Sequence, residues 1–209
     1  MTQETLMDGL SLDAGGTTGW FASPHRSEAL CTAARQWLGT PWAANSAAPG
    51  SDGGVSCHRL PHALLIGTGA LPLEFMVPAG DPNATRHSTD SRIARWLENC
   101  PEFHTVPLPG AIWAGDLLGF RIHRCLDHLA LALNPQCFVH VLRHQRTTLG
   151  YLTDPTWASR LIGVWRLQGG AAEGPSGGRD WKNERNATDP SSGIASLHPK
   201  TGATRHGQP

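Results

Sequence analysis

Apolar residues recur along this chain with two different spacings, one typical of helices and one typical of strands. In the first half, the helical spacing predicts three helices, over residues 27–38, 57–67 and 90–100. Ser27 is expected to cap the first helix, because its side chain can accept a hydrogen bond from a free backbone N–H. Gly67 is expected to end the second. The first half of the chain is therefore predicted to be mainly helical.

The second half contains short segments in which apolar and polar residues alternate or apolar residues run together. Turn residues separate these segments, so they predict an antiparallel sheet of about four to six strands, a usual size for a sheet. Helices that precede a sheet in this way indicate the α+β class, with the N-terminal helices packed on the sheet. The predicted strands lie within residues 116–124, 128–134, 137–144, 147–152 and 159–167.

The two ends of the chain differ from its middle in composition. Residues 1–24 are rich in Gly, Ser and Thr, and residues 169–209 show almost no apolar periodicity. Segments of this kind bury too little apolar surface to offset the entropy lost on ordering. We therefore expect a flexible lead, a folded domain over 25–168 and a disordered tail.

The charge balance argues against two classes of partner. Lys and Arg total 17, and Asp and Glu also total 17, so no net field favours nucleic acid or an anionic membrane. The first 20 residues lack the basic start and continuous apolar stretch of a Sec signal peptide. No apolar run is long enough to span a bilayer. We expect a protein made in the cytoplasm, with export by another route left open.

Five cysteines are spread irregularly and include no Cys-x-x-Cys pair. This pattern disfavours a structural zinc site and a disulfide framework, and the odd number fits a reducing compartment. Cys57 follows a glycine-rich turn at the start of a predicted helix, where the helix dipole and a nearby imidazole lower the pKa of a thiol. The alternative for Cys57 is a buried, inert thiol, which is what we expect of Cys31, Cys100, Cys125 and Cys137.

Two histidines are candidates for activating Cys57. His128 opens one predicted strand and His140 lies late in the next, and an antiparallel pairing centred on Asn134 places them opposite each other on one face. One imidazole could then take the Cys57 proton while the other orients it, which gives a Cys–His–His triad. Asp127 is expected to point to the other face and to be a surface charge.

A metal site is the competing interpretation of the same segment. Zinc sites usually contain compact pairs of ligands two to four residues apart at each end, and this segment does not supply two such pairs. We therefore expect no metal and no cofactor. The residues that such a site would use are His123, Cys125, His128 and His140.

Two blocks of the sequence resemble the NlpC/P60 family of papain-like cysteine peptidases. The block "GTPWAANSAAPGSDGGVSCHRL" is similar to the family's "GTPY…G…GVDCSGLV", and "GDLLGFRIHRCLDHLALALNPQCFVHV" is similar to its "GDLVFF…HVGIYLGNGKFIHA". The match spans about 29–167. The resemblance implies a papain-like α+β catalytic domain over 25–168. It also implies that Cys57 is the nucleophile, His128 the base and His140 the polar residue that orients the base.

Three residues near Cys57 depart from the family pattern. Trp42 replaces the usual tyrosine, Ser56 replaces the aspartate before the nucleophile, and His58 replaces the serine after it. These three side chains are our candidates for substrate binding. A helical insertion at about 71–109 is expected to form one wall of the cleft.

The resemblance implies a cysteine hydrolase that cleaves an amide bond in peptidoglycan stem peptides, so a peptide or muropeptide is the expected partner. A related alternative is an acyltransferase or a small-molecule amidase that uses the same thiol. An alternative of another class is a papain-like structural or binding module with little turnover. In that case, phage-tail, toxin or secretion-system components are the expected partners.

Overall fold

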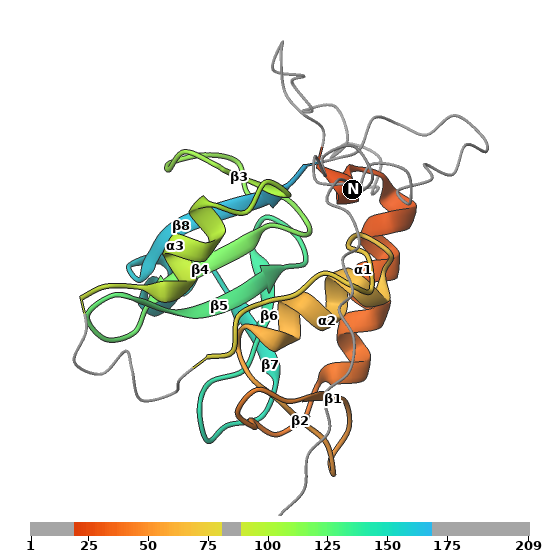
Figure 1. Ribbon diagram of the computed structural model, residues 1–209. Helices are drawn as coiled ribbons and strands as arrows, with labels where there is room; N and C mark the ends of the chain where they lie inside the picture. Colours follow the sequence, from red (N-terminus) through yellow and green to blue (C-terminus); the bar gives the residue numbers. More distant parts are fainter. Residues whose placement is uncertain (1–18, 81–88, 169–209) are drawn as a thin grey trace, which may run out of the picture. The chain divides into compact units, whose positions relative to one another are not determined.

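A six-stranded antiparallel sheet organises the computed structural model, which describes residues 19–80 and 89–168 (Figure 1). The lead expected over 1–24 lies mostly outside these ranges, and the tail expected over 169–209 lies wholly outside them. The strands follow the order β3-β8-β4-β5-β6-β7 across the sheet. Their bounds are β3 Phe103–Thr105, β4 Leu117–Arg121, β5 Leu126–Ala132, β6 Cys137–His140, β7 Thr148–Tyr151 and β8 Leu161–Leu167.

The three predicted helices are present as α1 (Pro24–Trp37), α2 (Arg59–Gly67) and α3 (Arg92–Glu98). No helix in the two described ranges is long and apolar enough to cross a bilayer. Besides β3, the sequence analysis missed several very short elements, because two to four residues are too few to show a periodicity. These are the 3₁₀ turn η2 (Trp20–Ala22), α4 (Pro155–Ala158) and the hairpin of β1 (Ala47–Ala48) with β2 (Gly54–Val55).

The start of α1 differs from the prediction. The helix begins at Pro24, and the Ser23 side chain accepts a hydrogen bond from the N–H of Arg26 at 3.2 Å, so Ser23 is the cap and Ser27 is not. Proline favours the first helical position, because its fixed φ suits the helix and its missing N–H would have no partner there. The pattern of apolar residues alone does not reveal this extra turn.

Apolar side chains cover both faces of the sheet. The helices α2 and α3 pack on one face, and α1 packs against α2 (Figure 1). On this face, Leu64 of α2 belongs to the same core as Leu129 of β5. The opposite face carries a smaller cluster formed around Phe120 and Phe138, which Trp157 of α4 helps to cover. From His128 onward, successive residues of β5 therefore point alternately to the smaller cluster and to the helices.

The pairing of β5 with β6 is centred one residue later than predicted. Leu131 lies opposite Val139, whereas the sequence analysis centred the pairing on Asn134. The side chain of Asn134 accepts hydrogen bonds from the next two free N–H groups, at 2.9 and 2.8 Å, and so sets where the turn ends. His128 and His140 are consequently two residues out of register. They stay on one face because the shift is an even number of residues.

A buried ion pair joins the start of β4 to β8. The Arg166 guanidinium donates to both carboxylate oxygens of Asp116 at 2.8 Å and stacks on the Trp113 ring, 3.7 Å from its centroid. Asp116 also accepts a hydrogen bond from the N–H of Trp113, as expected of a residue that serves a turn. This network holds the turn before β4 against the central part of the sheet.

Candidate active site

Five of the six side chains singled out in the sequence line one cavity, and the sixth lies behind it. The cavity has a volume of about 350 Å³. Its other walls include the residues that follow β4 and the loop 141–145 that follows β6. His140 is absent from the lining but lies next to a residue that belongs to it. The five predicted residues in the lining are Trp42, Ser56, Cys57, His58 and His128.

The β1–β2 hairpin and a tight turn place Cys57 directly before α2. The N–H of Ser56 donates to the carbonyl of Ser46 at 3.3 Å, which ties the end of the hairpin to the preceding loop. The carbonyl of Ser56 then accepts from the N–H groups of Arg59 and Leu60, both at 3.0 Å. The helix therefore begins at Arg59, and Cys57 lies in the turn before it instead of in its first turn.

The Cys57 thiol is held in its neutral form. Cys57 is half-buried as a residue, and burial of its thiol raises the pKa above the usual 9.0. Hydrogen bonds from the backbone of Leu129, His58 and Cys57 itself lower the pKa, but by less, and the Asp127 carboxylate raises it further. The expectation that the start of a helix lowers the pKa of this thiol is therefore wrong, because burial outweighs the backbone N–H groups.

The cavity lies at the level where β5 is not paired with β6. In the described sheet, β5 pairs with β6 only through Leu131 and Ala132. At the level of His128 the two strands are unpaired, so side chains from both faces of the sheet can reach the cavity. Cys57 reaches it from the helix-covered face, and His128 from the face of the smaller cluster. Within the described residues, no hydrogen bond joins the Cys57 sulfur to His128.

His128 and His140 form a buried pair of imidazoles. Their ring centroids are 5.3 Å apart at an interplanar angle of 79°, and Trp157 packs edge-on against His140 at 4.6 Å. The two residues are only 2% and 3% exposed. Burial lowers the pKa of His128 to about 3, with a contribution from His140, and lowers that of His140 to about 4. Both rings are therefore neutral at pH 7.

Asp127 lines the cavity, so the expectation that it is a surface charge is wrong. Its side chain is only 3% exposed and accepts a hydrogen bond from the N–H of Ile122 at 2.8 Å and another from the His123 ring. The cause is a β-bulge. Phe120 of β4 pairs with His128, but the next residue, Arg121, pairs with Leu126, so Asp127 has no partner across the ladder. Neither Asp127 nor His123 was predicted at the site, since alternation in a regular strand cannot show a bulge.

His58 closes the side of the cavity next to Cys57. Its Nδ1 lies 3.4 Å from the Ser56 hydroxyl, and its ring packs on the backbone of Gly80, where an added Cβ would be 2.6 Å from the imidazole. Gly80 belongs to the insertion predicted at 71–109, which therefore supplies part of the wall. Burial, together with the charges of Arg59 and His62, lowers the pKa of His58 to about 4.

Trp42 forms an aromatic and basic edge of the cavity. The backbone N–H of Trp42 donates to the backbone carbonyl of Gln145 at 2.8 Å, which anchors this residue to the loop after β6. The His144 ring lies 5.9 Å from the indole, and the Arg143 guanidinium is 5.6 Å from the ring centroid, within reach of a cation–π contact. Trp42 therefore lines the cavity beside an imidazole and a guanidinium.

The residues considered for a metal site do not gather around one point. Among residues 19–80 and 89–168, no three His, Cys, Asp or Glu side chains lie where they could hold a metal ion together. His128 and His140 instead pack with the aromatic rings of Phe120, Phe138 and Trp157.

Comparisons with known proteins relate this arrangement to one fold. No family model matches the chain, and no curated protein matches its sequence. Among solved structures, the chain is similar to a Staphylococcus aureus protein described as similar to lipoprotein and of the NLP/P60 family, with a TM-score of 0.52 and 18% identity. The match covers 74% of this chain and 45% of the S. aureus chain. The present chain therefore spans less than half the length of the S. aureus protein.

At this level of identity, the similarity establishes the fold. Helices that precede an antiparallel sheet, with a cysteine turn before α2, are the order predicted from the two sequence blocks. The predicted α+β class is confirmed. The chain has the papain-like α+β fold of the NlpC/P60 proteins.

Proposed function

We propose that this protein is a cysteine hydrolase that cleaves an amide bond in peptidoglycan stem peptides, with Cys57 as the nucleophile, His128 as the base and His140 as the residue that positions His128. The observation that carries the proposal is that Cys57 and His128 line one cavity while the His140 ring lies 5.3 Å behind that of His128. The NLP/P60-type fold is consistent with this chemistry, although the fold alone does not determine it.

The resting site is neutral, so the proton transfer is coupled to attack on the substrate. Burial disfavours both a thiolate at Cys57 and an imidazolium at His128. When the two charges form together, each stabilises the other, and that attraction is strong in a buried site. In this proposal, His128 therefore takes the Cys57 proton as the sulfur attacks the carbonyl carbon, and not before.

The remaining steps follow from the groups around the sulfur. The backbone N–H groups of Cys57 and His58 favour negative charge at the sulfur. In this proposal, they also stabilise the oxyanion of the tetrahedral intermediate. The C–N bond then breaks, and the imidazolium of His128 donates its proton to the leaving amine. Water hydrolyses the thioester on Cys57 and restores the thiol.

A panel of defined muropeptides, with the products identified by mass spectrometry, tests the proposal. The wild-type chain should release two fragments from at least one muropeptide. Cys57→Ala should release none, and His128→Ala should slow release by at least about 10²-fold. Cys137→Ala is the matched control, because this cysteine does not line the cavity, and it should retain activity. Cleavage by Cys57→Ala, or no cleavage across the panel, would count against the proposal.

A second function is a papain-like binding module of a phage tail, toxin or secretion assembly with little turnover. The specific observation in its favour is that the thiol has a raised pKa and that, among the described residues, the buried Nε2 of His128 has no hydrogen-bond partner. Binding of muropeptides without release of products, unchanged in Cys57→Ala, would favour the module over the enzyme.

A further inference from the structure

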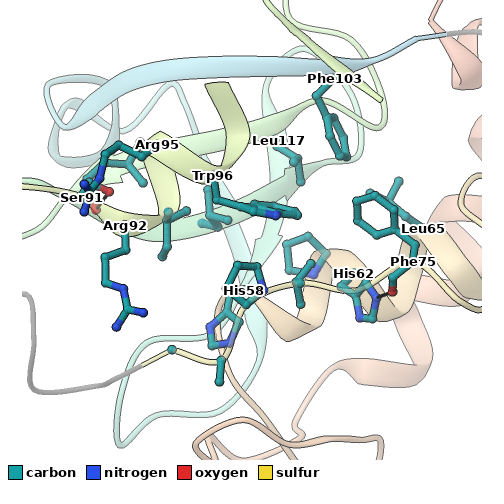
Figure 2. Close-up of a pocket in the computed structure, with 18 of the residues that line it drawn as sticks. His58, His62, Leu65, Phe75, Ser91, Arg92, Arg95, Trp96, Phe103 and Leu117 are labelled. Carbon is teal, nitrogen blue, oxygen red and sulfur yellow. Dashed lines mark hydrogen bonds between the residues drawn. The ribbon is translucent and has the colours of Figure 1, made fainter. Parts of the chain in front are cut away.

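A second cavity, separate from that of Cys57, lies between α2, α3 and the segment 71–80. Its volume is about 220 Å³. Figure 2 shows Trp96 of α3 extending toward the α2 side chains His62 and Leu65. The Phe75 ring lies 5.9 Å from the Trp96 ring in an edge-on contact and 6.3 Å from the Phe103 ring. One end of this cavity is therefore lined by apolar side chains, among them the aromatic rings of Phe75, Trp96 and Phe103.

The two cavities share one wall. His58, Gly80 and Ile93 line both of them. His58 is the residue directly after Cys57, so the apolar cavity begins one residue away from the proposed nucleophile. The apolar space therefore lies across this shared wall from the Cys57 cavity, which is edged by Asp127, His123 and basic side chains.

The size of the cavity limits what it can hold. A cavity of about 150 Å³ lined by aliphatic and aromatic side chains binds benzene. A volume of about 220 Å³ accommodates one larger group, such as a phenylalkyl side chain or an aliphatic chain of about six carbons. The ring of His62, which also lines the cavity, already donates to the Phe75 carbonyl at 2.7 Å. The end of the lining that holds Leu65 and Phe75 therefore offers little to a polar ligand, whereas Asp90, Ser91, Arg92 and Arg95 line the other end (Figure 2).

We propose that this cavity is an acyl subsite, which binds an uncharged apolar group attached to the carbonyl carbon that Cys57 attacks. The inference rests on the proposed role of Cys57 as the nucleophile. It departs from a stem-peptide substrate, whose acyl-side residues are small or charged, and favours the related acyltransferase or small-molecule amidase that uses the same thiol. The segment predicted as an insertion supplies much of the lining, including Phe75, Val77 and Trp96, so this part of the chain would set the specificity.

p-Nitrophenyl esters of increasing acyl size test the subsite with the full-length chain. The Cys57 sulfur forms a bond to the acyl carbon, the ester C–O bond breaks, and p-nitrophenolate leaves. The thiol proton goes to His128 and from there to solvent. The hexanoyl and 3-phenylpropanoyl esters should acylate Cys57 at least about tenfold faster than the acetyl ester, since one methylene in a fitted pocket already changes rates by about tenfold or more. Intact mass identifies the acyl-enzyme, and Cys57→Ala gives the background.

Two variants change the cavity, and a third is the matched control. Val77→Phe fills it and should slow hexanoyl transfer about tenfold while leaving acetyl transfer within about twofold. Phe75→Ala enlarges it and should shift the preference to longer chains, a gain that misfolding cannot produce. Met76→Phe introduces the same side chain at the neighbouring position, which is 72% exposed and outside the lining, and should leave the preference unchanged.

The outcomes separate the subsite from the function on which it rests. If the acetyl ester acylates Cys57 as fast as the hexanoyl ester and Val77→Phe changes neither rate, the subsite is refuted and the nucleophile stands. If no ester acylates Cys57, both proposals fall. Esters of acetyl-phenylalanine and acetyl-alanine form the peptide arm. If the acetyl-phenylalanine ester acylates Cys57 faster than the acetyl-alanine ester and Val77→Phe abolishes the difference, the occupant is a peptide side chain. If Val77→Phe slows only the hexanoyl ester, the occupant is an aliphatic acyl chain.

Discussion

The buried histidines His128 and His140 should make the free energy of unfolding fall steeply in mild acid. In the folded protein their pKa values are about 3 and about 4, against an ordinary value of 6.5. Both groups are bases with a lowered pKa, so the unfolded chain binds more protons than the native state between these values. The stability that depends on their neutrality is complete above about pH 6.5 and is lost as the pH falls toward about 4.

The magnitude follows from proton linkage. At about pH 5, a histidine that stays neutral in the folded state and has a pKa of 6.5 in the unfolded chain costs about 2 kcal/mol relative to about pH 7.5. Two such residues cost about 4 kcal/mol, which is a large part of the roughly 5–15 kcal/mol that stabilises a typical domain. Both side chains are almost fully buried, so solvent screening weakens this effect little.

Urea unfolding followed by tryptophan fluorescence at about pH 7.5 and about pH 5 measures the effect. His140→Leu keeps an apolar group beside Trp157 and removes one titrating ring, so its loss of stability between the two pH values should be about 2 kcal/mol smaller than that of the wild type. His25→Leu, at an exposed position of α1, is the control and should leave the wild-type loss unchanged. An equal loss in His140→Leu and the wild type would refute the reasoning, whatever the absolute stabilities.

Three further changes test other parts of the structure. Asp127→Asn removes a charge that raises the pKa of Cys57, so iodoacetamide should alkylate that thiol faster at a given pH, and an unchanged pH profile would contradict the assignment. Asp116→Asn leaves a buried guanidinium without its carboxylate and should lower the free energy of unfolding by about 3–5 kcal/mol in urea. Leu64→Ala creates a core cavity and should cost about 2–5 kcal/mol, whereas Leu73→Ala, at an 80% exposed position, should cost almost nothing. A similar cost for both leucines would disprove the packing argument.

The sequence by itself determined the order and type of the longer elements. The spacing of apolar residues predicted α1, α2 and α3, and alternation located five of the six strands of the large sheet. These patterns are local consequences of helical and strand periodicity, so one segment is enough to reveal them. The same reasoning, with the resemblance of two sequence blocks, predicted the papain-like α+β fold.

The tertiary structure decided the electrostatics and the exact geometry of the site. The pKa of Cys57 depends on how many atoms enclose the sulfur, and that number comes from β5 and its neighbours, far away in the sequence. The bulge at Asp127 depends on how β4 pairs with β5. The separation of β5 from β6 at the level of His128 depends on where these two strands stop pairing. Burial, pairing and cavity volume arise from contacts between distant segments, so no local pattern of residues contains them.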